Sequence, residues 1–282
     1  MKLACVQLTT GRDPAANLPD MIARIRQAHQ AGADFIGLPE TCNFMEKGRK
    51  AMQARLRAEA DMEELAALRG LAKELGIWLL AGSMIVAVED ADEGAPKAAN
   101  RSLLIAPDGE IAARYDKIHM FDVTLANGEK HRESDSYRPG GQAVCAAMGD
   151  MRLGMSVCYD LRFPALYRRL AEAGAEILSV PSAFTVPTGA AHWHVLLRAR
   201  AIETGCFVMA PAQVGAHENG RHTFGHSLII DPWGQVLAEA GETDRFIMAE
   251  IDLAQVSTAR SQIAALAHGR RFTLPDGGEA SD

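Results

Sequence analysis

Cys158 stands where a nucleophile is expected, at the end of an apolar, strand-like segment in LGMSVCYDLRFP (153–164), just before a turn and a helix. A thiol at such a turn can face the first backbone amides of the helix, which lower its pKa and favour the reactive thiolate. The run GMSVC approaches the G-x-S-x-G nucleophile elbow but lacks the last glycine, which makes Ser156 a weaker candidate. Most free cysteines are small buried hydrophobes, and we expect this of the mid-strand residues Cys5, Cys145 and Cys206.

Two charged residues also come directly after strand-like segments. Glu40 ends GLPE (37–40), where a carboxylate can act as a general base, and Lys117 lies in YDKIHMFD (115–122), where an ammonium can stabilise an oxyanion. Taken singly, a solvated or helix-capping glutamate and a surface lysine are the simpler interpretations. Because α/β sheets bind ligands at the carboxyl ends of their strands, we expect Glu40, Lys117 and Cys158 to lie together.

Apolar strand-like segments alternate with amphipathic helices along the chain, which is typical of an α/β fold. Asp13-Pro14 predicts a helix start, and Gly32 and Gly76 predict the ends of the first two helices. Buried strands are predicted at 3–8, 34–38, 77–85, 151–157, 175–180, 205–212 and 245–251. Later helices are predicted from Pro164, at 190–204 and at 253–266.

Three segments of the first half of the chain resemble three segments of the second half, in the same order. The pairs are MKLACV (1–6) with MRLGMS (151–156), AGADFIGLPE (31–40) with AGAEILSVPS (173–182), and NRSLLIAPDGEI (100–111) with GHSLIIDPWGQV (225–236). One such match is weak, since buried strand-and-turn units look alike, but three in order favour an internal duplication.

The duplication predicts the architecture. Two α/β halves with strongly apolar strands bury those strands best when sheet packs against sheet and the helices lie outside. We therefore predict a four-layer α-β-β-α sandwich with pseudo-two-fold symmetry. Residues 1–268 are expected to form one domain, and residues 269–282 a tail that is flexible or lies at a subunit interface.

Composition excludes several classes of function. The formal net charge of the 282-residue chain is −7, with acids and bases mixed, which does not favour nucleic-acid binding. No apolar run approaches the roughly 20 residues of a membrane helix, and the N-terminus has no signal-peptide pattern. Five cysteines without a CxxC pair indicate a reducing compartment, so we expect a cytoplasmic protein.

Motifs for cofactors and metals are also missing. The chain has neither G-x-G-x-x-G nor a P-loop, so no dinucleotide or nucleotide cofactor is expected. His192 and His194 are two residues apart and cannot share a helix face, and no carboxylate or cysteine cluster in the sequence completes a site. No metal is therefore expected. His192 is assigned to the substrate pocket or, as the simpler interpretation, to the helix surface.

Glu40 in LPET, Lys117 in YDKIHMFD and Cys158 in SVCYDLRFP resemble, in order and spacing, the three signature segments of the nitrilase superfamily of carbon–nitrogen hydrolases. The resemblance runs from KLACVQL to the IDL at 251–253. It implies a duplicated α-β-β-α sandwich and amide hydrolysis through a thioester. Cys158 is then the nucleophile and Glu40 the general base, which later donates a proton to the leaving ammonia. Lys117 and the backbone N–H of Tyr159 hold the oxyanion.

The same resemblance assigns supporting residues. Glu133, in RESDSYRPG (132–140), matches a second glutamate near the site and is expected to orient Lys117 or the substrate. Arg162 suits a substrate carboxylate because its guanidinium can bind bidentately, and a structural salt bridge is an equal alternative. Phe163, in the same motif, is expected beside it.

The motif CYDLRFP resembles the amidase branch of the superfamily, which includes omega-amidase and deaminated glutathione amidase. The loop RESDSYRPG resembles the second more than the first, and the resemblance implies a carboxylate-bearing linear amide as the substrate. Alternatives are omega-amidase, an N-carbamoyl amide hydrolase and a nitrilase, although nitrilases usually have Trp-Glu after the cysteine, where this chain has Tyr-Asp. A non-catalytic binding protein on the same fold is the alternative from another class. The resemblance also implies a homodimer or larger oligomer, formed through 190–204 and the tail.

Overall fold

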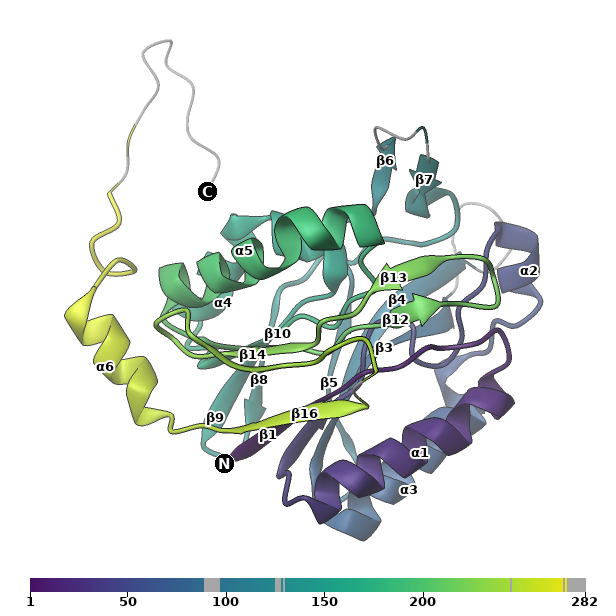
Figure 1. Cartoon of the computed structure of the whole chain (residues 1–282), viewed down its shortest axis with the longest axis horizontal. Coiled ribbons are helices and arrows are strands. Elements are labelled where there is room, and N and C mark those ends of the chain that lie inside the picture. The colour runs from purple at the N-terminus through teal and green to yellow at the C-terminus, as the bar shows by residue number, and fades with distance from the viewer. Residues whose placement is uncertain (89–96, 125–127, 129, 244, 271, 273–282) are drawn as a thin grey trace.

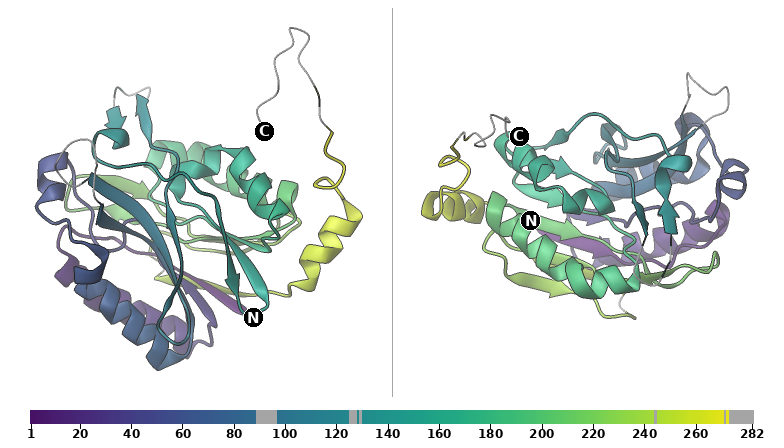
Figure 2. Two further views of the ribbon diagram at one scale, coloured as in Figure 1. Left: turned by 180° about the vertical axis from the view of Figure 1, so that it is seen from behind. Right: turned by 90° about the horizontal axis from the view of Figure 1, so that it is seen from above.

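The chain folds into two six-stranded sheets that pack against each other, with helices on both outer faces (Figures 1 and 2). The computed structural model describes residues 1–88, 97–124, 128, 130–243, 245–270 and 272. Helices α1 (Pro14–Gln30) and α3 (Glu63–Leu75) cover one sheet, and α4 (Pro164–Glu172) and α5 (Val186–Thr204) cover the other. The predicted four-layer α-β-β-α sandwich is confirmed.

The two sheets have the same topology. The first has the order β16-β1-β2-β3-β4-β5 and the second the order β8-β9-β10-β11-β14-β15. In each, the first strand is antiparallel to the second, three parallel strands follow, and two antiparallel strands complete the sheet. The equivalent strands β1 and β9, β2 and β10, and β4 and β14 carry the three sequence matches, so the predicted duplication is confirmed.

The strands of the first sheet are β16 (Phe246–Glu250), β1 (Lys2–Val6), β2 (Phe35–Gly37), β3 (Trp78–Val88), β4 (Lys97–Ile105) and β5 (Ile111–Asp116). Those of the second are β8 (Val144–Met148), β9 (Met151–Met155), β10 (Ile177–Ser179), β11 (Phe207–Ala210), β14 (Leu228–Ile230) and β15 (Val236–Glu239).

The helix ends follow local sequence signals. The Asp13 side chain accepts a hydrogen bond from the backbone amide of Ala15 at 3.1 Å and caps α1. Helix α3 ends at Gly76, whose φ of 65° is in the left-handed region that favours glycine. Helix α5 begins four residues before the predicted position, with Pro187 in its first turn. Proline is accepted there because a backbone N–H in the first turn has no acceptor within the helix. Helix α6 (Ala254–Gln262) is shorter than predicted.

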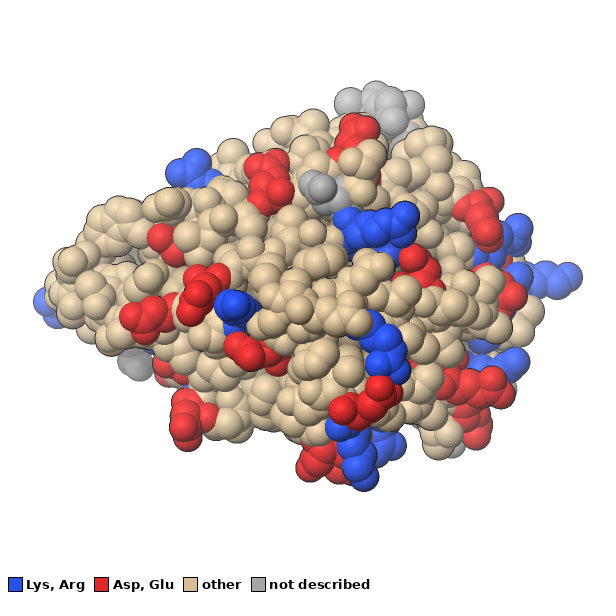
Figure 3. Space-filling model, turned by 60° about the horizontal axis from the view of Figure 1, so that its bottom comes forward, with Lys and Arg blue, Asp and Glu red and all other residues tan. Residues whose placement is uncertain are grey.

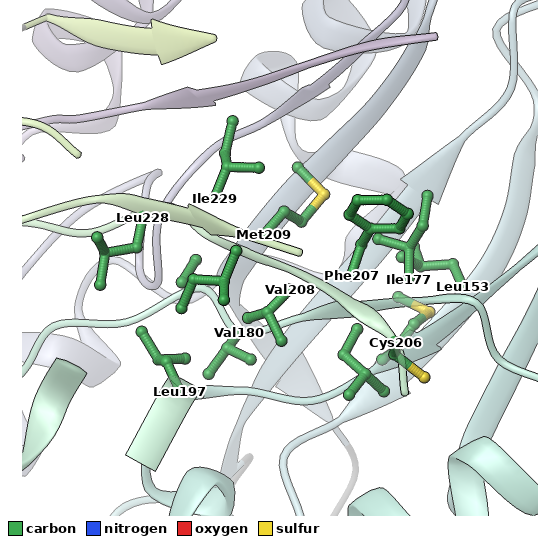
Figure 4. Close-up of a cluster of buried hydrophobic side chains, with 14 of the residues drawn as sticks. Leu153, Ile177, Val180, Leu197, Cys206, Phe207, Val208, Met209, Leu228 and Ile229 are labelled. Atoms are coloured by element: carbon green, nitrogen blue, oxygen red, sulfur yellow. The ribbon is translucent and has the colours of Figure 1, made fainter. Parts of the chain in front are cut away.

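Alternate residues of the strands of the first sheet pack into two different apolar clusters, one on each face of the sheet. In β1, Leu3 and Cys5 face the second sheet, whereas Ala4 and Val6 pack with residues of α1 and α3. Figure 4 shows part of the first cluster, in which side chains of β9, β10, β11 and β14 lie together with Leu197 of α5. Strands β1 and β2 are thus covered by a helix layer on one side and a sheet on the other, which is why they read as continuous apolar runs.

Small elements stand at one end of the sandwich. They are α2 (Arg49–Gln53), the hairpins β6 (Asp122–Thr124) with β7 (Lys130–Arg132) and β12 (Val214–Ala216) with β13 (His222–Phe224), and the 3₁₀ turns η2 (Glu133–Asp135) and η3 (Cys158–Arg162). A further 3₁₀ turn, η1 (Glu59–Asp61), precedes α3. Of the tail predicted at 269–282, only residues 269, 270 and 272 are described. That residues 1–268 form one domain stays a prediction.

The surface agrees with the mixed charge pattern of the sequence. On the face drawn in Figure 3, acidic and basic side chains are interspersed. Among the described residues, no helix is long and apolar enough to cross a membrane.

Candidate active site

Glu40, Lys117 and Cys158 meet at one end of the two sheets, as expected from their positions after strands β2, β5 and β9. The Lys117 ammonium donates to Glu40 Oε1 at 3.1 Å, and the Glu40 carboxylate and the Cys158 thiol line the same pocket. All three side chains are buried, with 4 %, 2 % and 8 % of their residue surfaces exposed. The first half of the duplicated chain thus supplies the carboxylate and the ammonium, and the second half supplies the thiol.

The backbone of Glu40 is held from both sheets. Gln213, which follows β11, donates through Nε2 to the carbonyl oxygen of Glu40 at 2.9 Å. Gly82 in β3 allows the loop after β2 to approach closely, because a Cβ at this position would lie 1.7 Å from the carbonyl oxygen of Leu38. The Glu40 carboxylate also accepts a hydrogen bond from Asn100 Nδ2 at 2.9 Å. Glu40 therefore has little freedom to move away from the thiol.

Cys158 occupies a strained turn between β9 and α4. Its φ of 50° lies in the left-handed region, which costs a residue other than glycine about 1 kcal/mol or more. Its backbone N–H donates to the carbonyl oxygen of Pro181 at 3.0 Å, which fixes the turn to the segment that follows the neighbouring strand β10. Tyr159 follows in the first turn of η3, where backbone amides lack an acceptor within the helix.

Asp160 holds this turn in place and was missed by sequence reasoning. Its fully buried carboxylate accepts hydrogen bonds from the hydroxyl of Tyr115 at 2.6 Å and from the backbone N–H groups of Val157 at 2.9 Å and His119 at 3.0 Å. The His119 ring lies 2.7 Å from the same carboxylate. The signal was an acidic residue inside an otherwise apolar strand-to-helix segment, which indicates a buried and paired carboxylate.

The charges around Lys117 determine the protonation of the site. Burial alone lowers the pKa of Lys117, but the carboxylates of Glu133 and Glu40 outweigh it and hold the pKa well above its ordinary value. Burial alone raises the pKa of Glu40, but the charge of Lys117 and the hydrogen bond with Cys158 hold it below its ordinary value. The ammonium and the carboxylate are therefore both charged at neutral pH.

The thiol of Cys158 behaves differently from the sequence prediction. Burial, and next the negative charge of Glu40, raise the pKa of Cys158 above its ordinary value, and Lys117 offsets only part of this. The expected lowering by helix amides is wrong, because the thiol is withdrawn from solvent and α4 begins only at Pro164. The resting group is a neutral thiol beside an ionised carboxylate. Of the other cysteines named above, Cys5 and Cys206 are buried as expected, whereas Cys145, on edge strand β8, is partly exposed.

The supporting residues occupy different positions. Both carboxylate oxygens of Glu133 lie 2.8 Å from Lys117 Nζ, and its role in orienting Lys117 or the substrate stays a prediction. Arg162 lies over the rings of Tyr159 and Phe184, and His192 Nδ1 is 3.3 Å from its Nη1. Within the described part of the chain Arg162 has no carboxylate partner, so the structural salt bridge is not found.

Two of the predicted residues lie behind the site. Phe163 stacks on His119, with ring centroids 3.5 Å apart, and meets Tyr159 edge-on. His192 is exposed on α5 and contacts Arg162, which lines the pocket. Neither belongs to the described residues that line the pocket.

A pocket of about 580 Å³ opens above Cys158. Among the described residues that line it, seven are lysine or arginine and four are aspartate or glutamate, although the whole chain carries a net charge of −7. Arg221, on the turn of the β12–β13 hairpin, is a lining residue that sequence reasoning missed, because no local motif marks it. Its Nε is buried and has no hydrogen-bond partner among the described residues, and its charge contributes to the lowered pKa of Glu40.

Comparisons with known proteins identify the family of this chain. The family model "Carbon-nitrogen hydrolase" matches residues 2–261. A relative from Synechocystis sp., named deaminated glutathione amidase, is 41% identical over 94% of this chain and 96% of its own length.

Solved structures show the same fold. The crystal structure of the C. elegans NitFhit protein is 37% identical with a TM-score of 0.86, over 95% of this chain and 65% of that one. A mutant amidase from Nesterenkonia sp. AN1, in which acrylamide has added to the active-site cysteine, is 25% identical with a TM-score of 0.76, over 94% and 98% of the two chains. The chain therefore belongs to the carbon–nitrogen hydrolase family and is a hydrolase of carbon–nitrogen bonds other than peptide bonds.

Proposed function

We propose that this protein is a cysteine-dependent amidase whose catalytic residues are Cys158, Glu40 and Lys117. The observation that carries the proposal is the meeting of three buried residues in one pocket: the Cys158 thiol beside the Glu40 carboxylate, which itself lies 3.1 Å from the Lys117 ammonium. A base in contact with the thiol can take its proton at the moment of attack, so a low thiol pKa is not needed.

Acylation uses each of the three groups. Glu40 takes the proton of the Cys158 thiol as the sulfur bonds to the amide carbonyl carbon, and the carbonyl electrons move to oxygen. Lys117 and the N–H of Tyr159 stabilise that oxyanion. When the oxyanion collapses, the carbon–nitrogen bond breaks and Glu40 returns the proton to nitrogen. The nitrogen leaves as ammonia from a primary amide or as an amine from a substituted one, and a thioester remains on Cys158.

Deacylation repeats these steps with water. Glu40 takes a proton from a water molecule whose oxygen attacks the thioester carbonyl, and the same two donors stabilise the second oxyanion. The carbon–sulfur bond then breaks, the acid is released, and the proton on Glu40 returns to the sulfur. The burial of Glu40 and Lys117 strengthens each of these interactions because little water screens them.

The charge of the pocket supports an anionic substrate. Among the described residues, the Arg162 guanidinium contacts aromatic rings and an imidazole but no carboxylate, and the buried Nε of Arg221 has no hydrogen-bond partner. A substrate carboxylate can therefore satisfy both guanidinium groups. We propose deaminated glutathione as the substrate. It carries a carboxylate at each end, and the 41% identity to a deaminated glutathione amidase supports the same choice.

The size of the pocket favours this substrate over the one expected of an omega-amidase. About 580 Å³ is in the range of pockets that hold drug-sized ligands, and a tripeptide-sized amide fills it better than a five-carbon amide does. Two arginines on different loops also suit two separate carboxylates better than one.

The deciding experiment is a comparison of substrates. Acid release is measured from deaminated glutathione, α-ketoglutaramate, an N-carbamoyl amino acid, a nitrile and a neutral amide, with Cys158→Ala as the control. We expect the highest kcat/KM for deaminated glutathione and no turnover by the variant. Activity retained by Cys158→Ala removes the assigned nucleophile. Binding of deaminated glutathione without turnover supports the non-catalytic binding protein instead.

We also propose that the chain forms a homodimer or larger oligomer. Ile202 of α5, Trp233 of the β14–β15 hairpin and Ile263 after α6 line one shallow groove, and all three are more than half exposed. Exposed apolar residues gathered in this way are typical of a subunit interface. Sedimentation should show an oligomer that Trp233→Glu dissociates. A wild-type monomer at micromolar concentration contradicts this proposal.

A further inference from the structure

Three residues from distant parts of the sequence converge beside α5. His194 lies in α5, His226 lies between β13 and β14, and Glu239 is the last residue of β15. His194 Nε2 is 2.9 Å and His226 Nδ1 is 2.8 Å from the same carboxylate oxygen, Glu239 Oε1. Their three potential ligand atoms all lie within 4.8 Å of one another.

The proposed mechanism uses none of these residues. None of the three is among the described residues that line the pocket above Cys158. All are accessible, with 34 %, 29 % and 40 % of the side chains of His194, His226 and Glu239 exposed. A small solute can therefore reach this cluster without passing through the active site.

The backbone at His226 is strained, and this conformation places its imidazole next to Glu239. Its φ of 55° is one of three left-handed values at residues other than glycine in the described chain, and the other two are at Thr41 and Cys158. Those two lie next to or in the active site, where strain holds a side chain in a working position. At His226 the turn is fixed by Trp193 Nε1, which donates to its carbonyl oxygen at 2.7 Å, and by Phe224, which stacks on its ring.

We propose that His194, His226 and Glu239 bind one divalent transition-metal ion, with Zn²⁺ as the best match. Two imidazole nitrogens and one carboxylate oxygen form a usual ligand set for zinc with an open coordination position. Metal–ligand bonds of about 2.0–2.2 Å in tetrahedral geometry place neighbouring ligand atoms about 3.3 Å apart. The spacings of 2.9 and 2.8 Å to Glu239 Oε1 need to open by a few tenths of an ångström, and the two imidazole nitrogens, which lie within 4.8 Å of each other, need to reach the same spacing of about 3.3 Å. Side-chain rotations at this exposed site can supply both changes.

Sequence reasoning excluded a metal because His192 and His194 cannot share a helix face. The structure agrees on that pair, since His192 contacts Arg162 whereas His194 contacts Glu239. The second imidazole and the carboxylate come instead from His226 and Glu239, which lie 32 and 45 positions further along the chain than His194. No local motif joins them.

The site is tested by titration of the full chain with Zn²⁺ alone, in a Cys158→Ser background so that the active-site thiol does not compete for the ion. Isothermal titration calorimetry should show about one high-affinity ion per chain. His194→Ala, His226→Asn and Glu239→Gln should each weaken binding by about tenfold or more. Asn is chosen for position 226 because it tolerates a positive φ.

His268→Ala is the matched control, since it removes an exposed histidine outside the cluster and should leave Zn²⁺ affinity unchanged. Replacement of Zn²⁺ by Co²⁺ adds a second readout, because a visible absorption band at the site should disappear in Glu239→Gln. Thermal unfolding of the metal-free variants shows whether each is folded. Equal Zn²⁺ affinity in the Cys158→Ser parent, the three variants and the control overturns the proposal, as does the absence of binding by the folded parent.

Discussion

Lys117 lies closer to Glu133 than to Glu40. Its Nζ is 2.8 Å from both oxygens of Glu133 and 3.1 Å from Glu40 Oε1. Glu133 also accepts a hydrogen bond from the backbone amide of Phe121 at 2.7 Å, so its own position is fixed. The ammonium is thus held by one carboxylate that does not touch the thiol and is shared with another that does. This arrangement leaves Glu40 free to exchange a proton with Cys158.

Glu133→Gln should slow the reaction without greatly weakening substrate binding. The amide keeps the shape of Glu133 but removes the largest of the charge contributions that raise the pKa of Lys117. The ammonium is then less firmly placed for the oxyanion, and we expect kcat to fall about 10²-fold with KM little changed. Steady-state kinetics decide this. A rise in KM with kcat unchanged assigns Glu133 to substrate binding instead.

The pH–rate profile should be broad. Glu40 must be ionised to act as a base, and its pKa is held below the ordinary value, so kcat/KM is lost only as the pH falls through this lowered value. Lys117 must be protonated, and its raised pKa keeps it so at alkaline pH. We expect a plateau from about pH 5 to 9, with an acid limb that belongs to the coupled Glu40–Cys158 pair.

A sharp optimum near pH 7 contradicts this charge arrangement. Glu40→Gln is the matched variant, because it cannot accept the thiol proton. It should lose the acid limb together with most of the activity.

Arg162→Lys and Arg221→Lys should separate the two proposed carboxylate contacts. Lysine keeps the charge but loses the planar pair of donors, so we expect KM for deaminated glutathione to rise about tenfold or more in each variant. KM for a neutral amide of similar length is the control and should change little. An equal rise for both substrates shows that the arginines shape the pocket rather than bind a carboxylate.

Asp160→Asn should destabilise the protein and disturb Cys158. The buried carboxylate accepts hydrogen bonds from Tyr115, Val157 and His119, and an amide group cannot accept all of them. We expect the free energy of unfolding to fall by about 2–4 kcal/mol, measured by urea denaturation. Activity should fall in the folded variant, since the turn that carries Cys158 loses its central acceptor. Unchanged stability shows that water replaces the lost bonds.

Much of the fold was predictable from sequence because its causes are local. The cap at Asp13, the stop at Gly76 and the apolar runs of β1 and β2 depend on neighbours within a few residues. The duplication was also visible, since equivalent strands kept their apolar pattern. The meeting of Glu40, Lys117 and Cys158 followed from the rule that strand ends share one edge of a sheet.

The rest depended on partners far apart in the sequence. The thiol pKa of Cys158 was predicted in the wrong direction, because burial and the charge of Glu40 are set by how two sheets pack and not by the turn itself. Asp160, Arg221 and the His194–His226–Glu239 cluster acquire their roles only from residues that the fold brings to them. The sequence by itself determined which groups were present and at which strand ends they lay. The tertiary structure decided their charge, their burial and their partners, since electrostatic energies depend on distance through space and on the exclusion of water.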